Sequence, residues 1–329
     1  MTHGEPSWAI AALADEPAPL IAAFARHHLA IGAREVHIFL DRPNPEAEAL
    51  LHGLEGCILA TCDQAYWDKV NNGRRPERHT GRQKFNATRV YQTTKCDWLL
   101  HCDVDEFIAD GAALSSLLNR EESAHGLVLR NRERVHLETE PGETIFEGAF
   151  RDPIGLTESD AKTLYGRFAK FLDFGLTGHR TGKTIVPTGR DWTMGVHYPI
   201  GADMGKMIKS ETRLLLHFDG LTELHYALKL LKKAFEDYSG PKRQIGQERE
   251  AQYRYIRNKA DNPKELFRLV HGVQSLNERQ ATTLGVLGVL HDTAFMPQNC
   301  ADLDLTTTTF NAMLRAREAA LIAKAGLEL

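Results

Sequence analysis

The sequence predicts an α/β protein built on an open, mostly parallel sheet with helices on both faces. Three observations support this fold class. Apolar segments of strand length alternate with amphipathic segments of helical length through about the first 110 residues, the strand-like segments are mostly apolar, and aspartates follow several of them. Strands of this kind are typical of parallel sheets, whose two faces are both covered by helices.

The expected elements follow one another as strand-helix-strand units. We expect strands at residues 7–13, 35–41, 57–63 and 97–102, and helices at 18–32, 47–55 and 81–95. Ligands of such sheets bind beyond the carboxyl ends of the strands. Asp41, Asp63 and Asp103 fall at such ends, so polar chemistry is expected there.

The second half of the sequence is less regular. Residues 141–162 and 175–192 are rich in Gly, Pro, Thr and charge, which indicates long loops around a site. Helical patterns return at 223–238, 248–260 and 309–326. We therefore expect one catalytic domain at residues 1–220 and a helical C-terminal extension, residues 221–329, packed on it.

The composition excludes few functions, but it bears on the expected partners and cell compartment. The 329 residues carry a net charge of −4, so the overall charge of the protein does not attract nucleic acid. The sequence shows no signal peptide and no membrane-spanning stretch, and its five cysteines lack zinc-site spacing. We expect a cytoplasmic protein with reduced thiols, no nucleic-acid partner and at most a peripheral contact at the inner membrane face.

The segment WLLHCDVDEF, residues 98–107, places three carboxylates directly after a buried strand. Asp103 and Asp105 would point to opposite faces of an extended strand, and both reach one ion only where the strand breaks into a turn. A new element starting at Glu106 would supply that break. Mg²⁺ and Mn²⁺ take oxygen ligands and complete their shells with substrate phosphates, so the pair is a candidate half-site; otherwise these acids cap a helix or face solvent.

Three segments together resemble the glycosyltransferase family 2-like proteins of the GT-A fold. They are FARHHLAIGAREVHIFLD, RQKFNATRVY and DWLLHCDVDEFI, and the resemblance covers roughly residues 8–130. It implies a metal-dependent transferase that binds a nucleoside diphosphate sugar. The sequence departs from the family in the loop LDRPNPEAE, where the family often carries an Asn/Ser/Asp-rich loop.

A later stretch, LLLHFDG at residues 214–220, is similar to the H-F-x-G motif of family 8-like glycosyltransferases. This resemblance implies that His217 is a third metal ligand, with His197 as the alternative. The motif's lysine is absent, because Glu223 stands in its place. The phosphate contact could come instead from Lys229, Lys232 or Lys183.

A basic segment at residues 74–89 precedes the D-x-D pair. Arg82, Gln83 and Asn86 partly share one helix face, and a guanidinium there could pair with phosphate oxygens. A solvated helix face is the simpler explanation. With the resemblance, the expected nucleotide contacts are Asp15, Asp41, Arg82, Gln83, Asn86, Asp103 and Lys183.

We expect a glycosyltransferase of hexosyltransferase type that moves a sugar from a nucleoside diphosphate sugar, most readily a UDP-sugar, to a hydroxyl of a glycan or polysaccharide. Asp103, Asp105 and His217 would bind Mn²⁺ or Mg²⁺, which stabilises the departing diphosphate. Asp191 would be the base, because it follows a strand-like segment and precedes Trp192, an aromatic side chain suited to stacking on a sugar.

Two alternatives stay open at this stage. A metal-dependent phosphohydrolase could use Asp103 as its nucleophile, although such enzymes place this motif on the first strand and follow it with a Gly or Thr turn. A non-catalytic nucleotide-binding module is the other alternative. Metal-dependent binding of a nucleoside diphosphate would argue against a module whose acids only cap helices.

Overall fold

A computed structural model describes residues 6–120, 125–140, 142–202, 204–236, 246–259 and 262–327. The chain divides into two compact units, each assembled from three stretches of sequence. Unit 1 comprises residues 1–131, 181–216 and 297–303, and unit 2 comprises residues 132–180, 217–296 and 304–329. No helix in the described ranges combines the length and the apolar character that crossing a membrane requires.

Unit 1 is built on a mixed sheet whose described strands follow the order β12-β6-β9-β4-β1-β2-β3. The neighbours β4, β1, β2 and β3 are parallel, whereas β9 runs antiparallel to both β4 and β6. The strands of this sheet are β1 (Trp8–Ala14), β2 (Glu35–Leu40), β3 (Cys57–Thr61), β4 (Trp98–His101), β6 (Leu127–Leu129), β9 (Lys183–Pro187) and β12 (Ile208–Lys209). The predicted α/β class with a mostly parallel sheet is confirmed.

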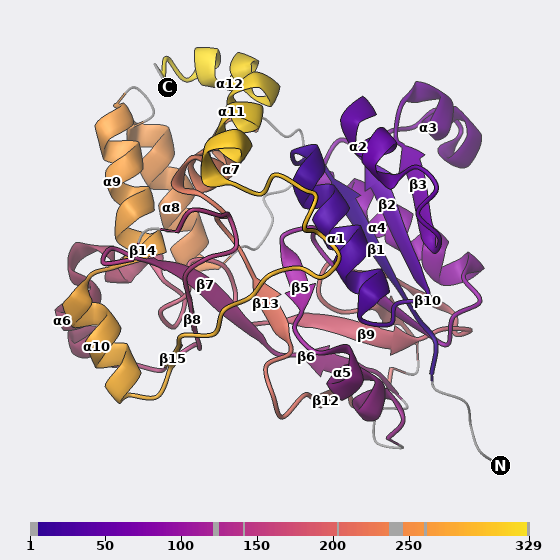
Figure 1. Ribbon diagram of the computed structural model, residues 1–329, viewed down its shortest axis with the longest axis horizontal. Helices are drawn as coiled ribbons and strands as arrows, with labels where there is room; N and C mark the ends of the chain where they lie inside the picture. The colour runs from indigo at the N-terminus through magenta and orange to yellow at the C-terminus, as the bar shows by residue number, and fades with distance from the viewer. Residues whose placement is uncertain are drawn as a thin grey trace. The chain divides into compact units, whose positions relative to one another are not determined.

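Strand β1 is buried along its whole length because helices cover both faces of the sheet. Ala9 and Ala11 pack in one cluster with Val90 and Tyr91 of α4. On the other face, the Trp8 ring contacts His28 of α1, which lies across β1 and β2 in Figure 1. The apolar pattern of the strand therefore follows from its central place in the sheet.

The helices of unit 1 begin at polar residues or prolines that suit a helix start. Asn44, Asp63 and Asp110 accept backbone N–H groups of the helices that follow them. The helices are α1 (Ala18–Ala30), α2 (Pro45–Leu51), α3 (Gln64–Asn71), α4 (His79–Thr93) and α5 (Gly111–Leu118). Asp63 is thus a cap and not a ligand-facing acid.

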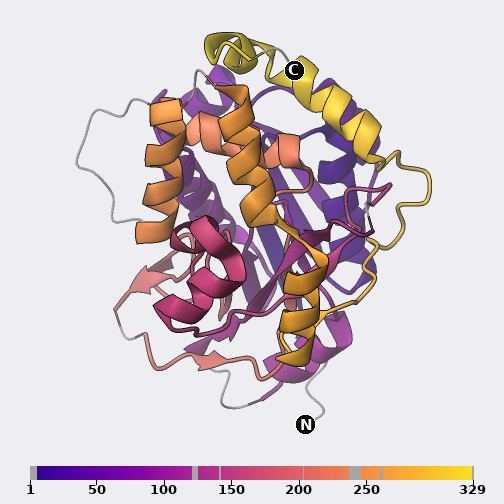
Figure 2. The ribbon, with the colours of Figure 1, turned by 90° about the vertical axis from the view of Figure 1, so that its left-hand side faces the viewer.

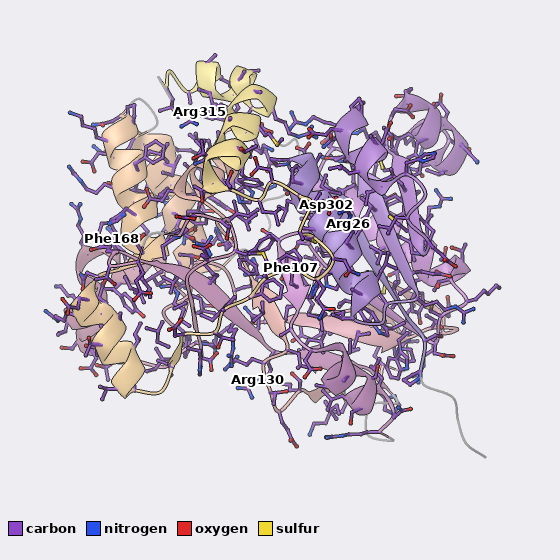
Figure 3. All side chains as sticks on the ribbon, viewed as in Figure 1. Arg26, Phe107, Arg130, Phe168, Asp302 and Arg315 are labelled. Carbon is purple, nitrogen blue, oxygen red and sulfur yellow. The ribbon has the colours of Figure 1, made fainter. Side chains whose placement is uncertain are left out.

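Short strands and a late segment complete unit 1. The short strands are β5 (Glu106–Ile108), the antiparallel pair β10 (Trp192–Thr193) and β11 (Ile200–Gly201), and β13 (Leu215–His217), whose last residue opens unit 2. The late segment 297–303 is fixed to α1, because Arg26 donates to Asp302 at 2.6 Å (Figure 3).

The strand ends come together at one edge of the unit 1 sheet. Ala14 of β1 lies opposite Leu40 of β2, and Ala11 lies opposite His101 of β4. Asp15, Asp41 and Asp103 each follow one of these parallel strands, so they share the carboxyl edge, as the sequence predicted.

Unit 2 combines a small sheet with most of the C-terminal helices. Strand β8 (Ala149–Arg151) lies between β7 (Asn131–Leu137) and β15 (Leu290–His291), and β14 (Ser275–Leu276) pairs with β7. The helices are α6 (Glu158–Tyr165), which runs into a 3₁₀ turn (Gly166–Phe171), α7 (Glu223–Phe235), α8 (Gln247–Lys259), α9 (Pro263–Gln274), α10 (Glu278–Val286), α11 (Thr307–Arg317) and α12 (Ala319–Lys324). Helices α8 and α9 lie side by side (Figures 1 and 2).

Two sequence expectations need correction. The units do not follow the predicted division at residue 220, because residues 132–180 join the C-terminal helices while 297–303 join the first sheet. The segments expected to be long loops also contain regular structure: β8 lies within 141–162, α6 begins there, and β9 lies within 175–192. Short strands paired through distant residues leave only a weak local pattern in the sequence.

Candidate active site at the strand ends

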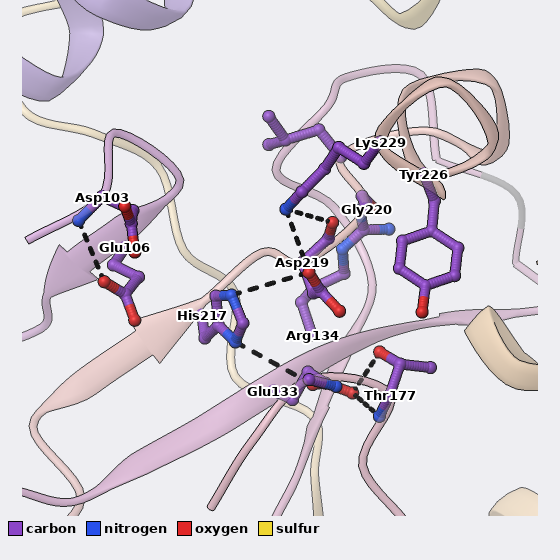
Figure 4. Close-up of polar contacts among 12 residues, drawn as sticks. Asp103, Glu106, Glu133, Arg134, Thr177, His217, Asp219, Gly220, Tyr226 and Lys229 are labelled. Atoms are coloured by element: carbon purple, nitrogen blue, oxygen red, sulfur yellow. Dashed lines mark hydrogen bonds and ion pairs between the residues drawn. The ribbon is translucent and has the colours of Figure 1, made fainter. Parts of the chain in front are cut away.

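The strand β4 ends at His101, and the chain turns through Val104 and Asp105 before β5 begins at Glu106. The Glu106 N–H donates to the Asp103 carbonyl at 3.0 Å, which closes the turn. The Asp103 N–H donates to Oε2 of Glu106, also at 3.0 Å (Figure 4). The break that two alternating aspartates need in order to approach one ion is therefore present.

Asp103 is held at both of its carboxylate oxygens. Gln83 of α4 donates to Oδ1, and Lys183 of β9 donates to Oδ2 at 2.6 Å. The Asp103 side chain is 32% exposed, whereas that of Lys183 is fully buried. Three of the residues predicted as nucleotide contacts thus form one hydrogen-bonded group.

Lys183 faces Asp103 and not a ligand. Its Nζ also lies 3.3 Å from Oε2 of Glu106 and 3.3 Å from the carbonyl oxygen of Val196. An ammonium group has three donors, and these three acceptors use them all. The prediction that Lys183 contacts phosphate is therefore corrected: a buried, saturated ammonium supports the carboxylates instead.

The electrostatics of this group keep Asp103 ionised. Burial by itself raises the pKa of the Asp103 carboxyl, but the charge of Lys183 and its hydrogen bond outweigh burial and hold that pKa well below its usual value. The neighbouring His101 is buried, and burial together with the charge of Lys183 lowers its pKa to about 4. His101 is therefore neutral, with Nδ1 2.6 Å from the Gly195 carbonyl oxygen.

Arg82 occupies a similar buried position at the end of β2. Its Nε and one terminal nitrogen contact the two oxygens of Asp41 at 2.6 Å each, and the other terminal nitrogen donates to the carbonyls of Pro76 and Glu77. Arg75 also donates to Asp41, at 2.8 Å, from a side chain that is 40% exposed. The predicted phosphate contact of Arg82 is not what the structure shows, because its guanidinium ties residues 76 and 77 to the strand end.

Asn86 and Asp15 also have protein partners. The Asn86 amide accepts from the Tyr66 hydroxyl at 2.6 Å and is almost fully buried, so it joins α4 to α3 and does not face a nucleotide. Asp15 accepts from Arg42 at 2.6 Å and stays at the carboxyl edge, where its nucleotide contact remains a prediction.

The position of Asp191 argues against its predicted role as base. Thr188 hydrogen-bonds to the carbonyls of Cys96 and Asp97, so the chain before Asp191 lies at the amino end of β4, opposite the end that carries Asp103. Trp192 is also not available to stack on a sugar, because it is 3% exposed and packs in the core. The local sequence pattern does not show that β9 runs antiparallel to β4. Because of this direction, the residues that follow β9 lie at the amino end of β4.

The two histidines considered as metal ligands belong to different units. His197, in unit 1, holds the start of β9: its Nδ1 lies 3.0 Å from the Gly182 carbonyl, and its own carbonyl accepts from Thr184. In unit 2, the His217 ring lies between two carboxylates, with Nδ1 3.9 Å from Glu133 and Nε2 3.9 Å from Asp219 (Figure 4). The participation of His217 in a metal site stays a prediction.

The surroundings of His217 in unit 2 are strongly paired. Glu133 is fully buried and accepts from Arg151, the Thr177 hydroxyl and two backbone N–H groups. Asp219 binds Arg249 at 2.6 Å and Lys229 at 2.9 Å. Lys229 therefore contacts a carboxylate, as does Lys232, which lies 2.9 Å from Glu318. Neither lysine is shown in the predicted phosphate-binding role.

Sequence reasoning missed the supporting role of Glu106. This side chain is fully buried, orients the backbone of Asp103 and contacts Lys183. The only local signal was its place directly after the D-x-D pair. A buried carboxylate needs a cation, and that requirement could have directed attention to the lysines that begin later strands.

The residues at the end of β4 suit a divalent cation. Asp103 and Asp105 offer oxygen ligands, which Mg²⁺ and Mn²⁺ prefer. Asp103 is ionised and partly exposed. The turn carries three carboxylates, those of Asp103, Asp105 and Glu106, and the buried ammonium of Lys183 contacts the first and the third.

Comparison of the sequence with protein-family models and with curated proteins found no match. Among solved structures, the chain is similar to a mannose-1-phosphate geranyltransferase from Thermus thermophilus. The identity is 10%, the alignment covers 83% of this chain and 69% of that one, and the TM-score is 0.26. A score this low carries no argument about function, so the functional conclusion depends on the strand-end residues alone.

Proposed function

We propose that this protein is a metal-dependent glycosyltransferase that transfers a sugar from a nucleoside diphosphate sugar, with UDP-sugars favoured, to a hydroxyl of a glycan or similar acceptor. The observation that carries the proposal is the turn after β4, where Asp103 is kept ionised and partly exposed beside Asp105. The turn lies at the carboxyl edge of a mostly parallel sheet, where ligands of this fold class bind.

The roles of the residues follow from their contacts. Asp103 and Asp105 would hold the Mn²⁺ or Mg²⁺ ion, and Glu106 fixes the backbone of the turn through the Asp103 N–H. When bound, the ion would act as a Lewis acid that stabilises the charge of the departing diphosphate. Asp15 and Asp41 lie along the same edge, where the nucleoside would extend away from Asp103.

The phosphohydrolase alternative is disfavoured by the place of the motif in the fold. Such enzymes carry their nucleophilic aspartate after the first strand and follow it with a Gly or Thr turn, whereas Asp103 follows β4 and the chain runs into Glu106 and Phe107. A non-catalytic nucleotide-binding module has no observation in its favour, and an assay of sugar transfer distinguishes it from an enzyme.

A panel of UDP-, GDP- and ADP-sugars, each tested with and without Mn²⁺, provides the direct test. We expect one donor to raise the melting temperature only when Mn²⁺ is present. At 100 times its dissociation constant, a ligand stabilises the folded state by about 2.7 kcal/mol. Absence of metal-dependent stabilisation by every donor would overturn the proposal.

We also retain His217 as the predicted third ligand. His217→Ala should weaken Mn²⁺-dependent nucleotide binding and nearly eliminate transfer, whereas His197→Ala should weaken binding much less. Equal effects of the two substitutions would remove His217 from the site without affecting the proposal for Asp103 and Asp105.

A further inference from the structure

We propose that Lys183 and Gln83 are positioning residues that hold the Asp103 carboxylate at its two oxygens and fix its orientation for a divalent cation. The inference rests on the proposed metal-dependent function. It adds that the geometry of this carboxylate is set by two residues that do not themselves touch metal or donor.

The two contacts approach Asp103 from different elements. Gln83 is on α4 and reaches Oδ1, while Lys183 is the first residue of β9 and reaches Oδ2. A carboxylate held at one oxygen can still rotate about its Cβ–Cγ bond. Contacts at both oxygens stop that rotation, and each oxygen keeps lone-pair capacity for a metal.

Neither residue is placed to bind the ligand directly. Gln83 is 4% exposed and Lys183 is fully buried. The Lys183 ammonium is saturated by Asp103, Glu106 and the Val196 carbonyl. Both therefore act through Asp103, in the way that hydrogen-bond partners of metal-binding carboxylates orient them.

A test of positioning must leave the local charge unchanged. Lys183→Met alone would remove a positive charge next to a metal ligand and leave Glu106 buried without its cation. In the double variant Lys183→Met/Glu106→Gln, one positive and one negative charge are lost together. The total charge of the turn stays as in the wild type, while the contact of Lys183 to Asp103 is removed.

The experiment measures Mn²⁺ binding by electron paramagnetic resonance and thermal stability in parallel. Loss of partners that orient a metal ligand typically weakens metal affinity about 10- to 100-fold, and we expect this loss in Lys183→Met/Glu106→Gln and in Gln83→Leu. Lys183→Arg, which keeps a charged donor, should retain more affinity than the double variant. Lys209→Met, at an exposed lysine of β12, is the matched control and should bind as the wild type does.

Asp105→Asn separates the possible outcomes. If the wild type binds no Mn²⁺, the metal-dependent function and this inference both fail. If the wild type binds and Asp105→Asn does not, but the double variant and Gln83→Leu bind as tightly as the wild type, only the positioning role is overturned. Gln83→Leu removes no buried charge, so it decides the question if the double variant does not fold.

Discussion

At the residue scale, the acids at the strand ends are used in two different ways. Asp41 is 5% exposed and is neutralised by the two arginines Arg82 and Arg75. Asp103 is 32% exposed and shares the cation Lys183 with Glu106. The first arrangement stabilises the local fold, while the second keeps an ionised carboxylate partly exposed to solvent, where a metal ion could bind.

Asp105→Asn should abolish Mn²⁺-dependent nucleotide binding with little change in melting temperature. Asparagine has nearly the same shape but lacks the charge that attracts a divalent cation. Asp105 is 5% exposed, so asparagine fills the same space, whereas alanine would leave a gap. Isothermal titration with UDP and Mn²⁺ measures the binding; normal affinity in a folded variant would exclude Asp105 as a ligand.

Arg82→Ala should reduce stability strongly. It removes one partner of a buried ion pair, which typically costs about 3 to 5 kcal/mol, and the lower value applies here because Arg75 still contacts Asp41. Arg75→Ala is the control, because its exposed ion pair should contribute about 1 kcal/mol or less. Urea unfolding compares the two, and equal losses would contradict the structural role assigned to Arg82.

At the element scale, β9 decides how the site is assembled. It lies antiparallel between β4 and β6, and it places Lys183 at the end of β4 that carries Asp103. The residue before it, Gly182, has a φ of +72°, and a Cβ there would lie 2.1 Å from the Leu129 carbonyl oxygen. The start of β9 therefore depends on glycine for both its conformation and its close contact with β6.

Gly182→Ala should shift the start of β9 and displace Lys183 from Asp103. We expect a loss of more than about 2 kcal/mol in unfolding free energy, because the substitution adds a backbone clash to an unfavourable φ. Mn²⁺ affinity should also fall. Gly189→Ala, beyond the other end of β9, has a similar φ of +77° with no atom within 4 Å of its Cβ, so it reports the conformational cost alone. Equal effects of the two variants would show that the contact with β6 is unimportant.

At the scale of the whole molecule, neutral buried histidines occur in both units. Burial lowers the pKa of His28 and His101 in unit 1, and that of His136 and His225 in unit 2. These side chains are uncharged in the folded state and titrate normally when the chain unfolds. Both units are therefore sensitive to mild acid.

Stability should decrease as the pH falls below about 6.5, the unperturbed histidine value. A folded-state pKa below the unfolded value stabilises the fold above the unfolded pKa, and that contribution is lost as the pH falls toward the folded pKa. For His101, a folded pKa of about 4 corresponds to about 3 kcal/mol over this interval. Melting temperatures at pH 7.5, 6.0 and 5.0 measure the trend, and a value independent of pH would contradict it.

Local sequence patterns were enough to predict the α/β class, the elements of the first sheet and the acids at its carboxyl edge. Apolar runs specify buried strands, and Asp103 follows one of them whatever the rest of the chain does. Even the turn before Glu106 could be predicted, because two alternating aspartates can reach one ion only where the strand breaks.

Only the tertiary structure shows which side chains each of these acids contacts. Lys183 lies 80 residues after Asp103 and Arg82 lies 41 residues after Asp41, so no local pattern connects either pair. The position of Asp191 could not be predicted for the same reason, because the direction of β9 is set by pairing with β4 and β6 and not by its own residues. Contacts between distant residues form when the chain packs, and they determine which charges are buried as supports and which remain near solvent.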